Sequence, residues 1–170
     1  IEYVSEEAGI VEVSRIMFPL VIVLTQDCDL EQEHKSATHQ NTQDSENGSQ
    51  PHDKMLFSVL VAPLYNAEHF YEGKHLSELK FQMQQINRKR SQGTNIVTNQ
   101  NQRYHYLEFP EDIPIVPSVI DFKHYFSVNT LYLKQMKSSR FVCCVSPLFR
   151  EDISQRFASF LSRIGLPEIK

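Results

Sequence analysis

The sequence has 170 residues and a net charge of −4, and its 41 % hydrophobic and 22 % charged residues are ordinary for one globular domain with a single core. No run approaches the roughly 18 apolar residues of a membrane span and no basic-then-apolar leader is present, so the sequence indicates neither a membrane protein nor a signal peptide. Three cysteines are an odd number, and the adjacent Cys143 and Cys144 would rarely bridge, which predicts a reduced, cytoplasmic protein.

The charges are unevenly distributed along the chain. Residues 1–53 contain eleven acidic residues against Arg15 and Lys35, whereas residues 79–107 contain five basic residues and no acid. Residues 134–163 are also mainly basic. Such asymmetry can steer a polyanion toward one face or pair two protomers, and a merely solvated surface is the alternative.

The first third of the chain predicts short strands around a polar loop. Residues 9–13 indicate a strand, and residues 19–24 indicate a stronger one because three β-branched residues follow each other. Between residues 31 and 54 the only apolar side chain is Ala37, too little to offset the entropy of ordering, so this segment is predicted to be a disordered loop. Residues 55–62 should pair with the strand at 19–24 as a hairpin with this loop at its tip.

The middle of the chain predicts helices followed by strands. Residues 66–71 indicate a short helix, and residues 77–90 indicate a longer one. Residues 103–109, 120–128 and 141–145 have the composition or alternation of strands. In the longer predicted helix the apolar residues lie at spacings of four and three: Leu79, Met83 and Ile86.

The end of the chain predicts an amphipathic helix. Ser146 suits the N-cap, Pro147 the first helical position, and Gly165 with Pro167 the end. One apolar stripe is expected to cover an open end or face of a sheet: Phe149, Ile153, Phe157, Phe160, Leu161 and Ile164. The predicted fold is mainly β (α+β), a small SH3-like antiparallel barrel with one internal helix and this C-terminal helix, forming a single domain over residues 1–170.

Two stretches resemble a known family. Residues 19–25 (PLVIVLT) and 59–64 (VLVAPL) are similar to the first conserved half of the PemK/MazF toxins, in a match that covers about residues 10–65. The resemblance implies an SH3-like barrel, dimerisation and metal-independent cleavage of single-stranded RNA. Phe18 stands where the family usually has Arg, and Leu64 follows Pro63 where Ser or Thr is usual, so the resemblance extends to the barrel but not to the activity.

A second resemblance covers more of the chain. The Ser/Thr-Gln-x-Cys-Asp motif at residues 25–29 resembles a group of uncharacterised bacterial proteins, as do residues 103–107, Asp121-Phe122 and residues 150–167. This resemblance supports one continuous domain and implies no particular reaction.

Two candidate sites depend on Cys28. A thiolate at Cys28 could act as a nucleophile beside His105 or His124, as in a cysteine-dependent hydrolase, and the alternative is a small residue that closes a strand. Metal binding by Cys28 with His34, His39 and His52 is not expected, because these spacings match no compact zinc pattern. No metal or other cofactor is predicted.

The acid-free segment offers a candidate nucleic-acid interface. Phosphates bind cations and bases stack on aromatic rings, so this mixture suits single-stranded RNA or DNA, and a solvated helix end is the alternative. The cations and rings concerned are Arg88, Lys89, Arg90 and Arg103 with Tyr104 and Tyr106.

Arg103 and His105 also suggest acid–base chemistry on a phosphate, with Thr25 as a third candidate group. Alternation places Leu107 on the same strand face as both of them, which favours His105 as a core residue instead. His124 shares its predicted face with Phe122 and Phe126, and the same alternative applies.

We therefore predict a binding module that recognises nucleic acid or a partner protein. The family resemblance implies a bacterial toxin–antitoxin or phage-defence setting, in which an antitoxin or a second copy of the chain is a candidate partner. The first alternative is an endoribonuclease toxin whose relocated site uses Arg103, His105 and Thr25. The second alternative is a cysteine-dependent hydrolase built on Cys28.

Overall fold

The computed structural model describes residues 2–7, 10–42 and 53–163, with backbone alone for residues 2–7, 10–15, 37 and 39–42. The chain divides into two compact units. Unit 1 consists of Ile1–Val21 with Pro63–Asp121, and unit 2 of Ile22–Ala62 with Phe122–Lys170. Each unit is therefore assembled from two separate chain segments. Within the part that is described, no helix is both long and apolar enough to cross a membrane.

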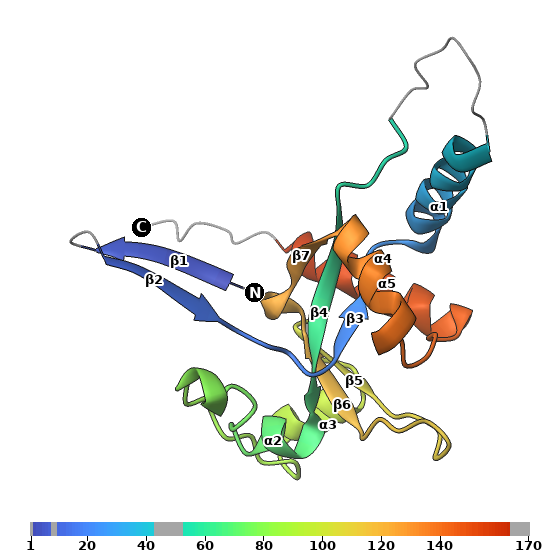
Figure 1. Cartoon of the computed structure of the whole chain (residues 1–170). Helices are drawn as coiled ribbons and strands as arrows, with labels where there is room; N and C mark the ends of the chain where they lie inside the picture. The colour runs from blue at the N-terminus through green and yellow to red at the C-terminus, as the bar shows by residue number, and fades with distance from the viewer. Residues whose placement is uncertain (1, 8–9, 43–52, 164–170) are drawn as a thin grey trace, which may run out of the picture. The chain divides into compact units, whose positions relative to one another are not determined.

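The main sheet has five antiparallel strands (Figure 1). The strand order is β3-β4-β6-β5, and β7 pairs with β4. The described pairings leave this sheet open, so the class predicted as mainly β with helices is confirmed as α+β, whereas no closed barrel is formed. The strands are β3 (Val21–Val23), β4 (Ser58–Asn66), β5 (Tyr104–Leu107), β6 (Ser118–Asp121) and β7 (Phe126–Asn129).

The predicted pairing of the two apolar strands near the start of the chain is confirmed. The Leu24 N–H donates to the Leu60 carbonyl at 2.8 Å, and the Leu64 N–H donates to the Leu20 carbonyl at 3.0 Å. The partner numbers run in opposite directions, as antiparallel strands require. The strand predicted at residues 9–13 is also confirmed, as β2 (Ile10–Arg15), which pairs with β1 (Glu2–Glu7) in a separate antiparallel hairpin.

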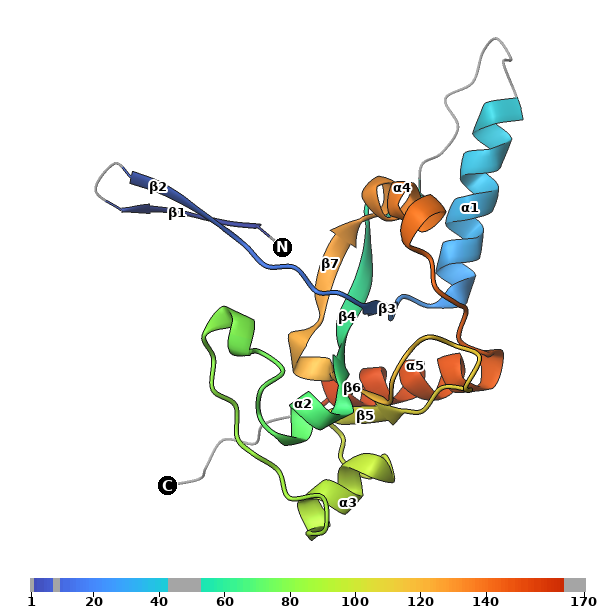
Figure 2. The same ribbon diagram turned by 60° about the horizontal axis from the view of Figure 1, so that its bottom comes forward.

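Unit 1 packs short helices against β5, β6 and the end of β4. These are α2 (Ala67–Tyr71), the 3₁₀ turn η1 (Ser77–Leu79) and α3 (Ser91–Val97), which lies beside β5 (Figure 2). The short helix predicted at 66–71 is confirmed, and Asn66 caps it by accepting a hydrogen bond from the Glu68 N–H at 2.8 Å. The core of this unit is apolar and largely aromatic: Tyr65, Ala67, Phe70, Tyr71, Leu76, Ile86, Ile96 and Val119.

The prediction of a long helix at residues 77–90 is wrong. The turn η1 ends at Leu79, and the next residue, Lys80, adopts a left-handed backbone with φ of 61°. The following segment is extended, because the Met83 N–H donates to the Gly73 carbonyl and the Ile86 N–H donates to the Tyr71 carbonyl. Gly73 permits this approach, since a Cβ there would lie 2.3 Å from the Met83 carbonyl oxygen.

The α-helices among the described residues of unit 2 are α1 (Asp27–Thr42), α4 (Thr130–Arg140) and α5 (Pro147–Leu161). The C-terminal helix was predicted correctly, with Ser146 at the N-cap position and Pro147 in the first turn. Ile153, Phe157 and Phe160 are buried, and both phenylalanines pack against Phe122 with tilted rings. Phe149 and Leu161 are exposed instead, and the remaining predicted stripe and end residues, Ile164, Gly165 and Pro167, lie outside the described residues.

Residues 31–42, predicted as part of a disordered loop, belong to helix α1, and residues 43–52 lie outside the described residues. Polar contacts stabilise this helix in place of an apolar stripe: Glu31 pairs with Lys35 one turn later, and Glu33 with Lys134 of α4. The predicted strand at 120–128 is interrupted by the 3₁₀ turn η2 (Phe122–His124), and residues 141–145 form no strand.

Candidate nucleic-acid interface

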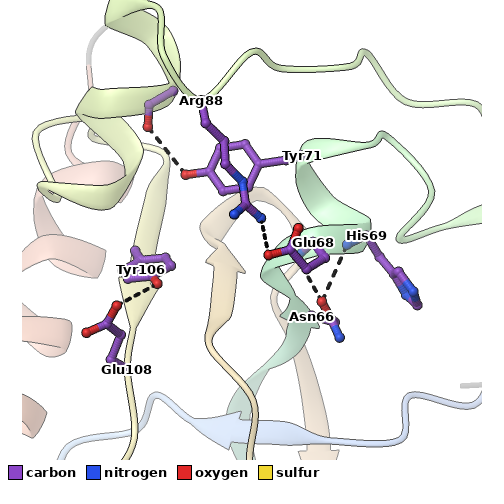
Figure 3. A network of polar contacts seen from close by, with 8 residues as sticks. Asn66, Glu68, His69, Tyr71, Arg88, Tyr106 and Glu108 are labelled. Atoms are coloured by element: carbon purple, nitrogen blue, oxygen red, sulfur yellow. Dashed lines mark hydrogen bonds and ion pairs between the residues drawn. The ribbon is translucent and has the colours of Figure 1, made fainter.

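Arg88 lies against the ring of Tyr71. Its guanidinium carbon is 4.4 Å from the ring centroid, a distance at which the cation and the aromatic face attract each other. The same guanidinium donates to a Glu68 carboxylate oxygen at 2.7 Å (Figure 3). Tyr71 is buried, and its hydroxyl donates to the Gly93 carbonyl of α3 at 3.3 Å. Helices α2 and α3 therefore hold the ring in place beneath Arg88.

Tyr106 of β5 is a second ring of unit 1, and the charge of Arg88 acts on its hydroxyl. Burial raises the pKa of Tyr106 to about 12, helped by its hydrogen bond to Glu108, while Arg88 acts in the opposite direction. On the backbone side, the Asn99 side chain accepts from the Tyr106 N–H at 2.6 Å and donates to its carbonyl at 3.0 Å. This amide takes the place of a neighbouring strand, so the position of Tyr106 is fixed at the edge of the sheet.

Lys89 and Arg90 follow Arg88 on a turn that leads into α3, and both are exposed. Within the described part of the chain neither side chain has a carboxylate partner. We call these two residues together with Arg88, Tyr71 and Tyr106 the basic–aromatic surface. It combines two unneutralised cations with a third cation that already lies on a ring.

Arg103 does not belong to this surface. Its Nε and Nη2 atoms donate to the two carboxylate oxygens of Asp121 at 2.8 and 2.6 Å, and Asp121 is only 1 % exposed. The hydrogen bond to Asp121 raises the pKa of Arg103 still further, so the group is a fixed cation. Since both of these donors are occupied by a buried carboxylate, Arg103 has a structural role in unit 1.

Tyr104 lies between Arg103 and the core. The Arg103 guanidinium carbon is 4.9 Å from the Tyr104 ring centroid. The Tyr104 and Phe70 rings meet edge to face, with centroids 5.0 Å apart. Burial raises the pKa of Tyr104. The ring is thus half-buried between Arg103 and the core of unit 1.

His105 is 1 % exposed and lies in the sheet opposite Ile120. Leu107, on the same face of β5, is buried as well. The burial of His105 that the alternation indicated is therefore confirmed. His124 lies in the 3₁₀ turn η2 and not in a strand, so it does not share an alternating face with Phe126.

Thr25 and Cys28 belong to unit 2, whereas Arg103 and His105 belong to unit 1. The Thr25 hydroxyl accepts a hydrogen bond from the Leu60 N–H at 2.7 Å, which extends the pairing between β3 and β4 by one residue. Cys28 is an exposed free thiol in the first turn of α1. Its described polar contacts are long ones, to the Gln26 side-chain oxygen at 3.6 Å and the Asp29 carboxylate at 3.8 Å, and include no histidine.

No group of metal-ligating side chains occurs among the residues whose side chains are described. His34 is exposed on α1, the His39 side chain is not described, and His52 lies outside the described residues. Comparison of the chain with known protein families, curated proteins and solved structures finds no match.

Tyr71 and Glu68 were missed from the sequence. Each lies at least seventeen residues before Arg88, in a helix whose pattern indicates only core packing. One sequence feature does indicate a distant partner: residues 79–107 contain no acid. Any arginine of this segment that forms an ion pair must therefore pair with a carboxylate from another part of the chain.

Proposed function

We propose that this chain is a binding module for single-stranded nucleic acid and that the basic–aromatic surface forms the contact. The observation that supports this most is the position of Arg88 on the Tyr71 ring, directly before the exposed Lys89 and Arg90. Single strands bind through cations that meet the phosphates and rings that stack with the bases. Both kinds of group are placed side by side in unit 1.

The arrangement favours binding over cleavage. A cleavage site needs a cation that can accept a phosphate and a base that can reach the ribose hydroxyl. Arg103 is occupied by Asp121, and His105 is buried. The described polar contacts of Cys28 include no histidine that could activate its thiol. Our proposal therefore includes neither the relocated endoribonuclease site nor the cysteine-dependent hydrolase.

The biological setting is a proposal that rests on the resemblance to the PemK/MazF toxins. It includes an SH3-like arrangement of the strands in the open sheet, a cytoplasmic location, and a bacterial toxin–antitoxin or phage-defence role. In such a role a partner protein, an antitoxin or a second copy of the chain would bind in addition to nucleic acid.

The test compares two double substitutions that remove equal charge. Fluorescence anisotropy measures the binding of a labelled single-stranded RNA to the unchanged protein, to Lys89→Gln with Arg90→Gln, and to Lys137→Gln with Arg140→Gln on α4. We expect the first variant to bind about tenfold more weakly at low salt and to lower the slope of log K against log salt by about 1.4, because two phosphate contacts are lost.

The α4 variant is the control, since Lys137 and Arg140 are exposed and carry the same charge in unit 2. Its affinity should stay close to that of the unchanged protein. Binding that does not respond to salt, or an equal loss in both variants, would reject the proposed surface.

A further inference from the structure

Glu68 contacts Arg88 from the first turn of α2. The Glu68 backbone N–H donates to the side chain of Asn66, the N-cap, so the backbone at Glu68 is held in this turn. The carboxylate remains open to solvent, since the Glu68 side chain is 69 % exposed and the Arg88 side chain 44 % exposed. An ion pair this exposed is weak and can be exchanged for another anion.

The same ion pair keeps a cation on the Tyr71 ring (Figure 3). Arg88 therefore occupies two positions that a nucleic-acid strand would use: the cation that a phosphate seeks and the ring face on which a base stacks. As long as Glu68 and Tyr71 hold Arg88, neither position is open to a ligand.

We propose that the Glu68–Arg88 ion pair is an autoinhibitory contact of the basic–aromatic surface. A ligand phosphate displaces the Glu68 carboxylate, Arg88 moves to that phosphate, and a neighbouring base stacks on the uncovered ring of Tyr71. The inference rests on the proposed function and identifies its ligand as a flexible strand, because phosphate and base must reach adjacent points together. Glu68 acts as an internal competitor, so its charge sets the affinity.

The test measures salt-dependent binding of a single-stranded RNA to Glu68→Gln. Glu78→Gln is the matched control, because Glu78 is an exposed acid of unit 1 that has no cation partner among the described residues. The double variant Glu68→Gln with Arg88→Gln removes the released cation as well.

We expect Glu68→Gln to bind about threefold more tightly than Glu78→Gln, the size of effect that a released surface ion pair produces. Its slope of log K against log salt should equal that of Glu78→Gln, since Arg88 meets a phosphate in both complexes. The double variant should lose the gain in affinity and have a slope shallower by about 0.7, because Arg88 no longer meets a phosphate.

The outcomes separate the two proposals. No binding by the unchanged protein or by any variant would overturn both the function and the autoinhibitory contact. Binding by the unchanged protein with equal affinity in Glu68→Gln and Glu78→Gln would overturn the contact alone, as would a gain that persists in the double variant.

Discussion

At the scale of single residues, the ion pair between Arg103 and the buried Asp121 shows how a predicted ligand-binding cation can instead be bound within the fold. The register of β5 and β6 places Tyr104 opposite Asp121, and this brings the carboxylate within reach of the preceding residue, Arg103. The spacing of eighteen residues between the two charges carries no sequence signal. A buried carboxylate is costly unless it is paired, so Asp121 holds the Arg103 side chain in an ion pair that stabilises unit 1.

This ion pair predicts an asymmetric effect on stability. Arg103→Gln should lower the free energy of unfolding by about 3 kcal/mol, because it leaves the buried charge of Asp121 without its partner. Adding Asp121→Asn to that variant should cost little more, since the uncompensated charge is then removed. Urea unfolding of the two single variants and the double variant measures this coupling. Strictly additive losses would show that the two side chains act independently.

At the scale of elements, some helices form because of their own sequence and others because of contacts with distant residues. Helix α5 was predicted because its proline, N-cap position and apolar spacing all lie within its own sequence. Helix α1 was not, because its stabilising partners are distant in the chain: Asp27 pairs with Arg150 and Glu33 with Lys134. The helix predicted at 77–90 does not form, because backbone groups at and just after the end of α2 bind this segment and hold it extended.

Two phenylalanines of α5 test how this helix contributes to stability. Phe157 is buried against Phe122 and Tyr125, with ring centroids 5.5 and 5.2 Å away, whereas Phe149 is 57 % exposed. Phe157→Ala should therefore cost about 3–5 kcal/mol of unfolding free energy, and Phe149→Ala less than about 0.5 kcal/mol. Thermal and urea unfolding compare the two. Similar losses at both positions would mean that α5 packs differently from the arrangement described.

At the scale of the whole molecule, both basic segments are partly neutralised by acidic residues from elsewhere in the chain. The sequence predicted an acidic start and two basic stretches but could not show which of them is neutralised. In unit 2 the acidic helix α1 pairs with the later stretch, at Arg150 and Lys134. In unit 1 Lys89 and Arg90 have no such partner among the described residues. Lys137 and Arg140 of the later stretch are exposed as well, so the Tyr71 ring under Arg88, and not the charge alone, favours the earlier stretch as the interface. Two predicted members of the earlier stretch, Arg103 and Tyr104, pack within unit 1 instead.

The most direct test of the basic–aromatic surface is to map where a strand lies on the protein. A single-stranded RNA that carries 4-thiouridine is cross-linked by light to the folded chain, and mass spectrometry identifies the peptides that are joined to it. We predict cross-links at Tyr71, at Tyr106 and within residues 86–93, all of which disappear at high salt. Cross-links confined to unit 2, or none that depend on salt, would contradict the account.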